Sequence, residues 1–223
     1  MPELKVKQQL LSKAQYVNEK SKKTQVVLHL TAGSNRPDYV IQGWAADATR
    51  VGTHFVIGGM SSTGDKAFDG AVYQALPEEK FIYHLGLKGT LFNNGLHDRS
   101  SIGIEICNWI QLTRTPDGKF LNYVNREVPA SQVVTLGTAY RGYLYYHAIT
   151  DAQIASLRSL ILDLCARHGI VLTKGKTYQD VDFAYDPKRA ATQQITFHSA
   201  YRQDKTDLPG LPNLIQMLNG LHV

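Results

Sequence analysis

The chain has 223 residues, 43% of them hydrophobic and 19% charged, with a formal net charge of +5 at pH 7. This composition is typical of a packed globular protein and excludes intrinsic disorder, and no apolar run approaches the ~20 residues needed to span a bilayer. Two cysteines, Cys107 and Cys165, are too few for a disulfide framework, and their apolar neighbours predict buried thiols. The basic residues are not interleaved with aromatics in a stripe, so we expect no nucleic-acid partner.

The N-terminal segment, residues 1–23, is predicted to be a basic, helical arm that precedes a domain of residues 24–223. Much of the positive charge lies in this arm, on Lys5, Lys7, Lys13, Lys20, Lys22 and Lys23. The arm has no apolar stretch followed by a small-residue cleavage site, so it is not a secretory signal peptide. We therefore expect a chain that is cytoplasmic or that leaves the cell by another route.

Alternating apolar residues predict the strands in the first half of the chain. These strands are expected within residues 24–33, 51–59, 70–76 and 100–109, with a short helix within 34–48. In the last of them, "SSIGIEICNW", Ile102, Ile104 and Ile106 share one face and Glu105 lies on the other.

The second half of the chain contains the strongest helix signal. Thr150 and Gln153 form a capping box before an apolar stripe, and Gly169 ends the helix. The tyrosine-rich stretch before this helix fits either a strand or irregular structure. A final strand is expected at 192–198 and a C-terminal helix at 211–220. Strands and helices without a linker between them predict an α/β fold, a single domain with a central mixed β-sheet flanked by helices.

Two histidines interrupt or end apolar strands: His29 lies inside "VVLHLT" and His198 ends "ITFH". A lone histidine in a strand is more often a hydrogen-bonded packing residue than a metal ligand. Two histidines and a carboxylate are also the ligand set of a catalytic zinc site, whose fourth position is left for water. Glu105 stands between isoleucines, where an unpaired carboxylate is costly. The spacing leaves both interpretations open, because the chain has no HExxH or CxxC motif.

Several short blocks follow one another in a familiar order. They are "VVLHLTAG", "THFVIGG" with "AVYQAL", "YHLG", "SSIGIEI" and "FHSAYRQDKTDLPG", and they cover most of residues 24–218. In these blocks the chain resembles the zinc-dependent N-acetylmuramoyl-L-alanine amidases, the family shared by phage lysins, bacterial anhydromuropeptide amidases and peptidoglycan recognition proteins. "SIGIE" and the "KTDLPG" ending are fairly specific together. The resemblance implies a peptidoglycan amidase-like fold.

The resemblance implies a set of zinc ligands. His29 and His198 match the two histidines that hold Zn²⁺ in the family. The third ligand lies in the turn "KTDLPG", where Asp207 takes that role, and Asp204 is then either solvated or placed behind the ligands. An extra leucine, Leu208, separates Asp207 from the proline of this turn and departs from the family pattern.

The resemblance also implies catalytic roles. Glu105 matches the "SIGIE" glutamate, which would accept a proton from water and pass it to the leaving amine. Lys205 matches a lysine that would stabilise the oxyanion together with zinc. His84, in "YHLG", occupies a substrate-facing position and is expected to bind substrate. Residues 111–149 match no family block, and we interpret them as an insertion in the amidase domain.

The implied function is zinc-dependent hydrolysis of the amide bond between N-acetylmuramic acid and L-alanine in peptidoglycan or muropeptides. The basic charge, the arm and the insertion favour a phage endolysin or another hydrolase of the intact, anionic cell wall, released by a non-signal route such as phage lysis. A cytoplasmic enzyme that recycles muropeptides is one alternative. A non-catalytic peptidoglycan-binding module is another, which the complete set of metal and catalytic residues disfavours. Peptidoglycan or a muropeptide is the expected partner, without insertion into a membrane.

Overall fold

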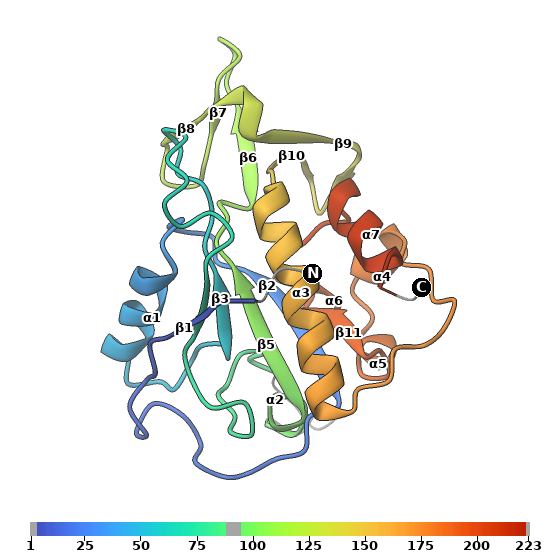
Figure 1. Cartoon of the computed structure of the whole chain (residues 1–223). Helices are drawn as coiled ribbons and strands as arrows, with labels where there is room; N and C mark the ends of the chain where they lie inside the picture. Colours follow the sequence, from blue (N-terminus) through green and yellow to red (C-terminus); the bar gives the residue numbers. More distant parts are fainter. Residues whose placement is uncertain (1–3, 88–94, 222–223) are drawn as a thin grey trace.

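A six-stranded sheet lies at the centre of the computed structural model, which describes residues 4–87 and 95–221 (Figure 1). In spatial order its strands are β1 (Val6–Gln8), β4 (Val72–Gln74), β3 (Phe55–Ile57), β5 (Ser101–Ile106), β2 (Gln25–Leu30) and β11 (Ile195–Phe197). β3, β5, β2 and β11 are parallel, whereas β3 and β4 are antiparallel, so the sheet is mixed, as predicted. The carboxyl ends of the four parallel strands therefore meet at one edge of the sheet.

One face of the central sheet packs against α3 (Asp151–His168), which crosses in front of the sheet in Figure 1, and α7 (Pro212–Asn219) packs beside α3. Leu28 of β2 and Ile104 of β5 share a buried cluster with Leu160 of α3. Each of these side chains is fully buried, which stabilises the fold by about 1.5–3 kcal/mol per residue. The apolar stripe predicted for this helix is the surface that it buries.

The ends of α3 lie where the sequence predicts them. Thr150 Oγ1 accepts a hydrogen bond from the Gln153 backbone N–H (3.1 Å), and the Gln153 side chain accepts one from the Thr150 N–H (3.1 Å). Gly169 ends the helix in the left-handed conformation, with φ at 64°. The predicted capping box is thus confirmed.

A helix covers part of the opposite face of the sheet. Ile41 of α1 (Pro37–Ala46) packs with Val56 of β3 and Tyr73 of β4 in a second buried cluster. Glu105 pairs with Val56, so its side chain projects from this same face. α1 therefore covers only the β3–β4 side of this face, and the β5–β2 side is covered by other segments of the chain.

Residues 111–147 form a second, antiparallel sheet, which lies above the central sheet in Figure 1. Its strands, in spatial order, are β8 (Glu127–Val128), β7 (Phe120–Leu121), β6 (Gln111–Arg114), β10 (Tyr143–His147) and β9 (Val133–Tyr140). A 3₁₀ turn, Ala130–Gln132, precedes β9. The tyrosine-rich stretch is therefore a β-hairpin, which decides between the two structures that its pattern allowed. Its status as an insertion relative to the family stays a prediction.

The N-terminal arm is not helical, and this prediction was wrong. Between residues 4 and 23 the described chain contains β1, which pairs in parallel with β4, and an isolated bridge from Val17 to Phe81. The arm is also not wholly solvated, because Lys23 is buried and its Nζ donates to the carbonyl oxygen of Arg99 (2.8 Å). Burial lowers the pKa of Lys23 to about 7, against the attraction of Asp98. Pairing with a sheet edge outweighs weak helix propensity here.

The remaining helices are short and lie mostly in the C-terminal third. They are α2 (Leu96–Ser100), α4 (Asp180–Phe183), α5 (Pro187–Ala190) and α6 (His198–Tyr201). Both cysteines are buried free thiols, as predicted. Within the described ranges, the structure has no helix with the length and apolar character that a membrane crossing requires.

Candidate metal centre

Strand register brings together three of the residues singled out from the sequence. His29 of β2 lies opposite Glu105 of β5 in a parallel pair, so both side chains project from the face that α3 does not cover. On the other side of β2, Phe197 of β11 lies opposite Leu28. His198, the next residue, therefore leaves its strand beside His29, and the two imidazole centroids are 4.5 Å apart.

Asp207 reaches the two histidines from an irregular segment. Its Oδ2 lies 3.3 Å from His198 Nδ1. One ligand atom each from His29, His198 and Asp207 can be chosen so that all three lie within 4.8 Å of one another. These residues are only 3%, 8% and 6% exposed. The structure thus gathers two imidazoles and one carboxylate at a single buried point.

The neighbours of His198 determine which of its ring nitrogens faces this point. Nε2 lies 3.2 Å from the carbonyl oxygen of Leu85, which can only accept, so Nε2 carries the hydrogen. In the neutral ring Nδ1 then has a lone pair, and this lone pair faces the Asp207 carboxylate. Two acceptors in contact repel each other unless a proton or a cation lies between them.

A chain of hydrogen bonds assigns His29 in the same way. Ser101 Oγ donates to the carbonyl oxygen of His97 (2.6 Å) and so accepts from His84 Nε2 (2.9 Å). His84 Nδ1 is then the acceptor for the Nε2 hydrogen of His29, at 2.9 Å. Nδ1 of His29 is left with its lone pair. Both histidines therefore offer Nδ1 to a metal, each fixed by a bond from Nε2, as is usual for metal-binding histidines.

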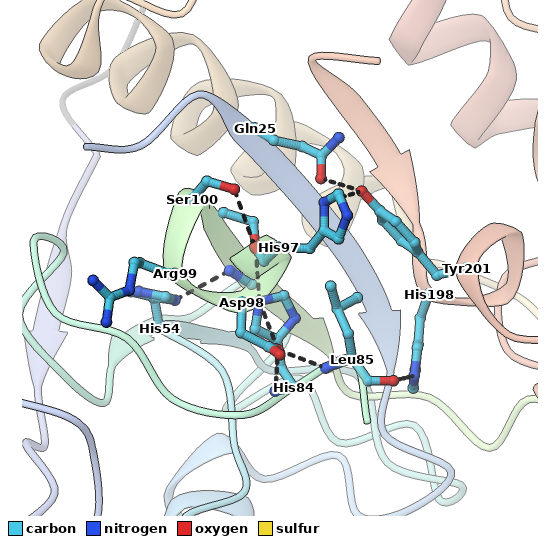
Figure 2. A network of polar contacts seen from close by, with 12 residues as sticks. Gln25, His54, His84, Leu85, His97, Asp98, Arg99, Ser100, His198 and Tyr201 are labelled. Atoms are coloured by element: carbon cyan, nitrogen blue, oxygen red, sulfur yellow. Dashed lines mark hydrogen bonds and ion pairs between the residues drawn. The ribbon is translucent and has the colours of Figure 1, made fainter. Parts of the chain in front are cut away.

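Asp98 holds the short backbone segment whose groups orient both histidines (Figure 2). Its Oδ1 accepts the backbone N–H groups of His84 and Leu85, at 2.8 and 2.9 Å. The same short segment supplies the His84 ring to His29 and the Leu85 carbonyl to His198. The sequence did not predict these supporting contacts. No sequence pattern shows which distant histidine will donate a hydrogen bond to a given backbone carbonyl.

The three candidate ligands fit a divalent metal ion. Asp207 Oδ1 is buried and has no hydrogen-bond partner, which costs free energy unless something else satisfies it. Burial, and then the neighbouring His198 and His84, hold the pKa of His29 well below its ordinary value, so its ring is neutral. Neutral imidazoles and an ionised carboxylate are the donors that Zn²⁺ takes in catalytic sites. A metal ion would satisfy all three groups at once.

A cavity of about 480 Å³ opens over these ligands. Glu105 and Lys205 line it together with the candidate ligands. Burial, and then the charge of Asp207, raise the pKa of Glu105 to about 8, although the nearby Lys205 opposes this shift. A carboxyl group with this pKa can take up and release a proton near neutral pH. Glu105 and Lys205 therefore both line the cavity beside the candidate ligands, and their catalytic roles stay predictions.

The choice between the two aspartates of the loop follows from their partners. Asp204 forms a two-point ion pair with Arg202, at 2.9 and 2.5 Å, and its side chain is 63% exposed. Asp207, in contrast, is buried against His198. Leu208, the residue that departs from the family pattern, adopts a left-handed backbone (φ 59°) and is fully buried. The extra residue is thus accommodated by a left-handed backbone conformation directly after Asp207.

His84 lies differently from the expectation of a substrate-facing residue. It borders the cavity, but both ring nitrogens are bound within the protein, to His29 and Ser101. A role in binding substrate stays a prediction, and the geometry favours a role in orienting His29. His54 is fully buried and accepts the Gly103 N–H at Nδ1 (3.1 Å), as expected for a packing residue.

The family is established by comparison with known sequences. The model of the N-acetylmuramoyl-L-alanine amidase family matches residues 19–210. The chain belongs to this family. It is therefore an amidase by descent, with peptidoglycan as the substrate that the family implies. A comparison with curated protein sequences gives no significant match.

Solved structures share the fold of this amidase at low sequence identity. A mutant endolysin from Bacillus subtilis has a TM-score of 0.52 and 16% identity, over 99% of this chain and 97% of that chain. The catalytic domain of XlyA has a TM-score of 0.51 and 17% identity, over 98% and 97% of the two chains. AMPDH3 from Pseudomonas aeruginosa has a TM-score of 0.50 and 18% identity, over 93% and 63%. The predicted α/β fold is thereby confirmed.

Proposed function

We propose that this amidase uses Zn²⁺ to hydrolyse the amide bond between N-acetylmuramic acid and L-alanine, and that its substrate is the intact cell wall. The observation that supports this proposal is the convergence of His29, His198 and Asp207 on one buried point, with an unpaired carboxylate oxygen. Zinc bound there would supply a positive charge that polarises the scissile carbonyl and makes water more acidic. The remaining chemistry falls to side chains of the chain itself.

Glu105 is the proposed general base and acid. It projects into the cavity from β5, opposite His29, and its raised pKa suits a group that exchanges protons near neutral pH. It would accept the proton of the attacking water and return it to the nitrogen of L-alanine as that nitrogen leaves. One group can perform both steps because the proton it takes in the first is the proton it gives in the second.

Lys205 is the proposed oxyanion donor. Its side chain lines the same cavity as Glu105, from the loop that carries Asp207. An ammonium group placed there would stabilise the negative charge that develops on the carbonyl oxygen, and one such donor is typically worth ~3 kcal/mol. The same positive charge opposes the rise in the pKa of Glu105, so the two groups are coupled.

The intact wall is proposed as the substrate because it is anionic and this chain carries a formal charge of +5. The second sheet lies beside the catalytic loop: Gln111 of β6 accepts a hydrogen bond from Thr206 (2.9 Å). It thus adds surface next to the cavity that a polymeric substrate could contact. Soluble muropeptides are the competing substrate, and release by phage lysis is the proposed route to the wall.

Product analysis tests this proposal. Purified sacculi and soluble muropeptides would be incubated with the protein, with and without a chelator, alongside a Glu105→Gln control. The expected result is release of stem peptides that begin with L-alanine, faster from sacculi, lost with the chelator and restored by zinc. New reducing sugar ends would identify a glycosidase and contradict the proposal. Faster release from soluble muropeptides would instead assign the enzyme to muropeptide recycling.

A further inference from the structure

Arg141 connects the second sheet to the loop that carries Lys205 and Asp207. It lies in the two-residue turn between β9 and β10, where Arg141 and Gly142 both have positive φ, at 49° and 88°. Hairpins favour such turns, but usually with asparagine or aspartate at the first position. An arginine held in this conformation is uncommon and calls for a compensating interaction.

The guanidinium group of Arg141 supplies that interaction. Nη2 donates to the carbonyl oxygen of Ser199 (2.7 Å). Nη1 lies within hydrogen-bonding distance of three more carbonyl oxygens, those of Arg202 (3.0 Å), Gln203 (2.7 Å) and Lys205. One side chain therefore lies within hydrogen-bonding distance of four backbone carbonyls of the segment 199–205, and two of its nitrogens donate to them. Only arginine presents enough donors in a fixed planar fork to do this.

The segment that Arg141 binds has little regular structure of its own. Beyond α6, residues 202–211 belong to no helix or strand. The backbone bond from Lys205 N–H to Arg202 is long, at 3.4 Å. Yet this loop must place Lys205 in the cavity and Asp207 beside His198. The second sheet supplies hydrogen bonds that hold it, through Arg141 and the Gln111–Thr206 bond, and Leu208 anchors its end in the core.

We propose that Arg141 is a positioning residue, which holds the loop 199–207 in the conformation that presents Asp207 to the metal and Lys205 to the substrate. The second sheet then serves catalysis as a rigid support for this loop. Arg141 does not border the cavity, and its guanidinium is occupied by carbonyls, so it acts through the loop and not on the substrate. The expected effect of Arg141 on catalysis rests on the proposed function, whereas its expected effect on the conformation of the loop does not.

Arg141→Ala tests the proposal, with Arg114→Ala as the matched control. Arg114 is an exposed arginine on β6 of the same sheet. For Arg141→Ala we expect zinc affinity, measured by chelator competition, to fall about 10–100-fold, as when a partner that orients a ligand is lost. Amide hydrogen exchange at residues 203–207 should accelerate, and kcat should fall more than KM rises. Arg114→Ala should leave all three measurements unchanged.

Two further measurements separate positioning from general destabilisation. Millimolar guanidinium, well below denaturing concentrations, should partly restore zinc affinity and exchange protection to Arg141→Ala and have no effect on Arg114→Ala. Arg141→Lys keeps the charge but not the fork, so it should fold like the parent and still lose zinc affinity. Parental zinc affinity and loop exchange in both Arg141 variants would overturn the proposal. If the parent releases no stem peptides, the proposed function fails, while loop exchange still decides the role of Arg141.

Discussion

The metal centre takes its residues from two regions that are held in different ways. His29 and Glu105 lie on adjacent parallel strands, where backbone hydrogen bonds and the buried core fix their positions. Lys205 and Asp207 lie on an irregular loop, held by side chains of the second sheet. The strand residues should therefore tolerate distant changes, whereas the loop residues should depend on contacts far from the metal. The predictions below test this difference.

The largest effect is expected on the strand side, at the proposed base. Glu105→Gln removes the proton acceptor but keeps the shape of the side chain, so kcat should fall about 10²–10⁴-fold. Zinc content should stay at the parental level, because Glu105 is not a ligand and its strand is fixed by the sheet. Glu127→Gln, an exposed glutamate on β8, is the control for loss of a carboxylate. Near-normal turnover by Glu105→Gln would end this assignment.

The two aspartates of the loop form the next test. Asp207→Ala should lower zinc affinity by more than the roughly 10–100-fold cost of losing an indirect partner, since a direct ligand is removed. Asp204→Ala should change zinc affinity little, because it breaks only an exposed ion pair with Arg202. Chelator competition measures both. The reverse order of effects would show that the loop presents Asp204 to the metal.

Substitution of His84 tests how strongly His29, on strand β2, depends on the side chain that orients its ring. In His84→Phe, His29 Nε2 loses its acceptor, and zinc affinity should fall about 10–100-fold with little change in KM. A substrate-binding role predicts the opposite, an increased KM with parental zinc affinity. Titration of zinc into the apo-protein and steady-state kinetics on soluble muropeptides distinguish the two results, and thermal unfolding checks that the variant is folded.

The smallest effect is expected at His54, on the pH dependence of the protein's stability. Burial, followed by the charge of Lys23, lowers the pKa of His54 well below its ordinary value of 6.5, although its bond to the Lys80 carbonyl opposes the shift. Below pH 6.5 the unfolded chain therefore binds more protons than the folded one, and stability is lost as the pH falls. His54→Gln keeps one donor and one acceptor in the side chain and removes the titration.

Thermal unfolding between pH 7.5 and 5 measures this effect. The melting temperature of His54→Gln should decline less steeply on acidification than that of the parent, by about 2–4 °C for each kcal/mol of stability that titration removes. Arg141→Ala offers the contrast, because it alters the loop and should shift the whole profile without changing its slope. Parallel profiles of His54→Gln and the parent would contradict the linkage of His54 to stability.

The sequence by itself determined the elements whose signals are local. Alternation placed Glu105 and the isoleucines on opposite faces of β5, and the pair Thr150 and Gln153 marked the start of α3. Both signals are periodic or short-range, so they survive without knowledge of the fold. The blocks around His29 and His198 were sufficient to indicate the family and its candidate ligands.

Only the tertiary structure decided what depends on contacts between distant segments. The arm reads as a basic helix, yet β1 adds to the sheet edge because an unpaired edge offers hydrogen bonds that a short isolated helix cannot match. His84 reads as a substrate contact, yet its two nitrogens bind His29 and Ser101. Arg141 gave no sequence signal, because its partners are backbone carbonyls some 60 residues away, and carbonyls are the same in every residue.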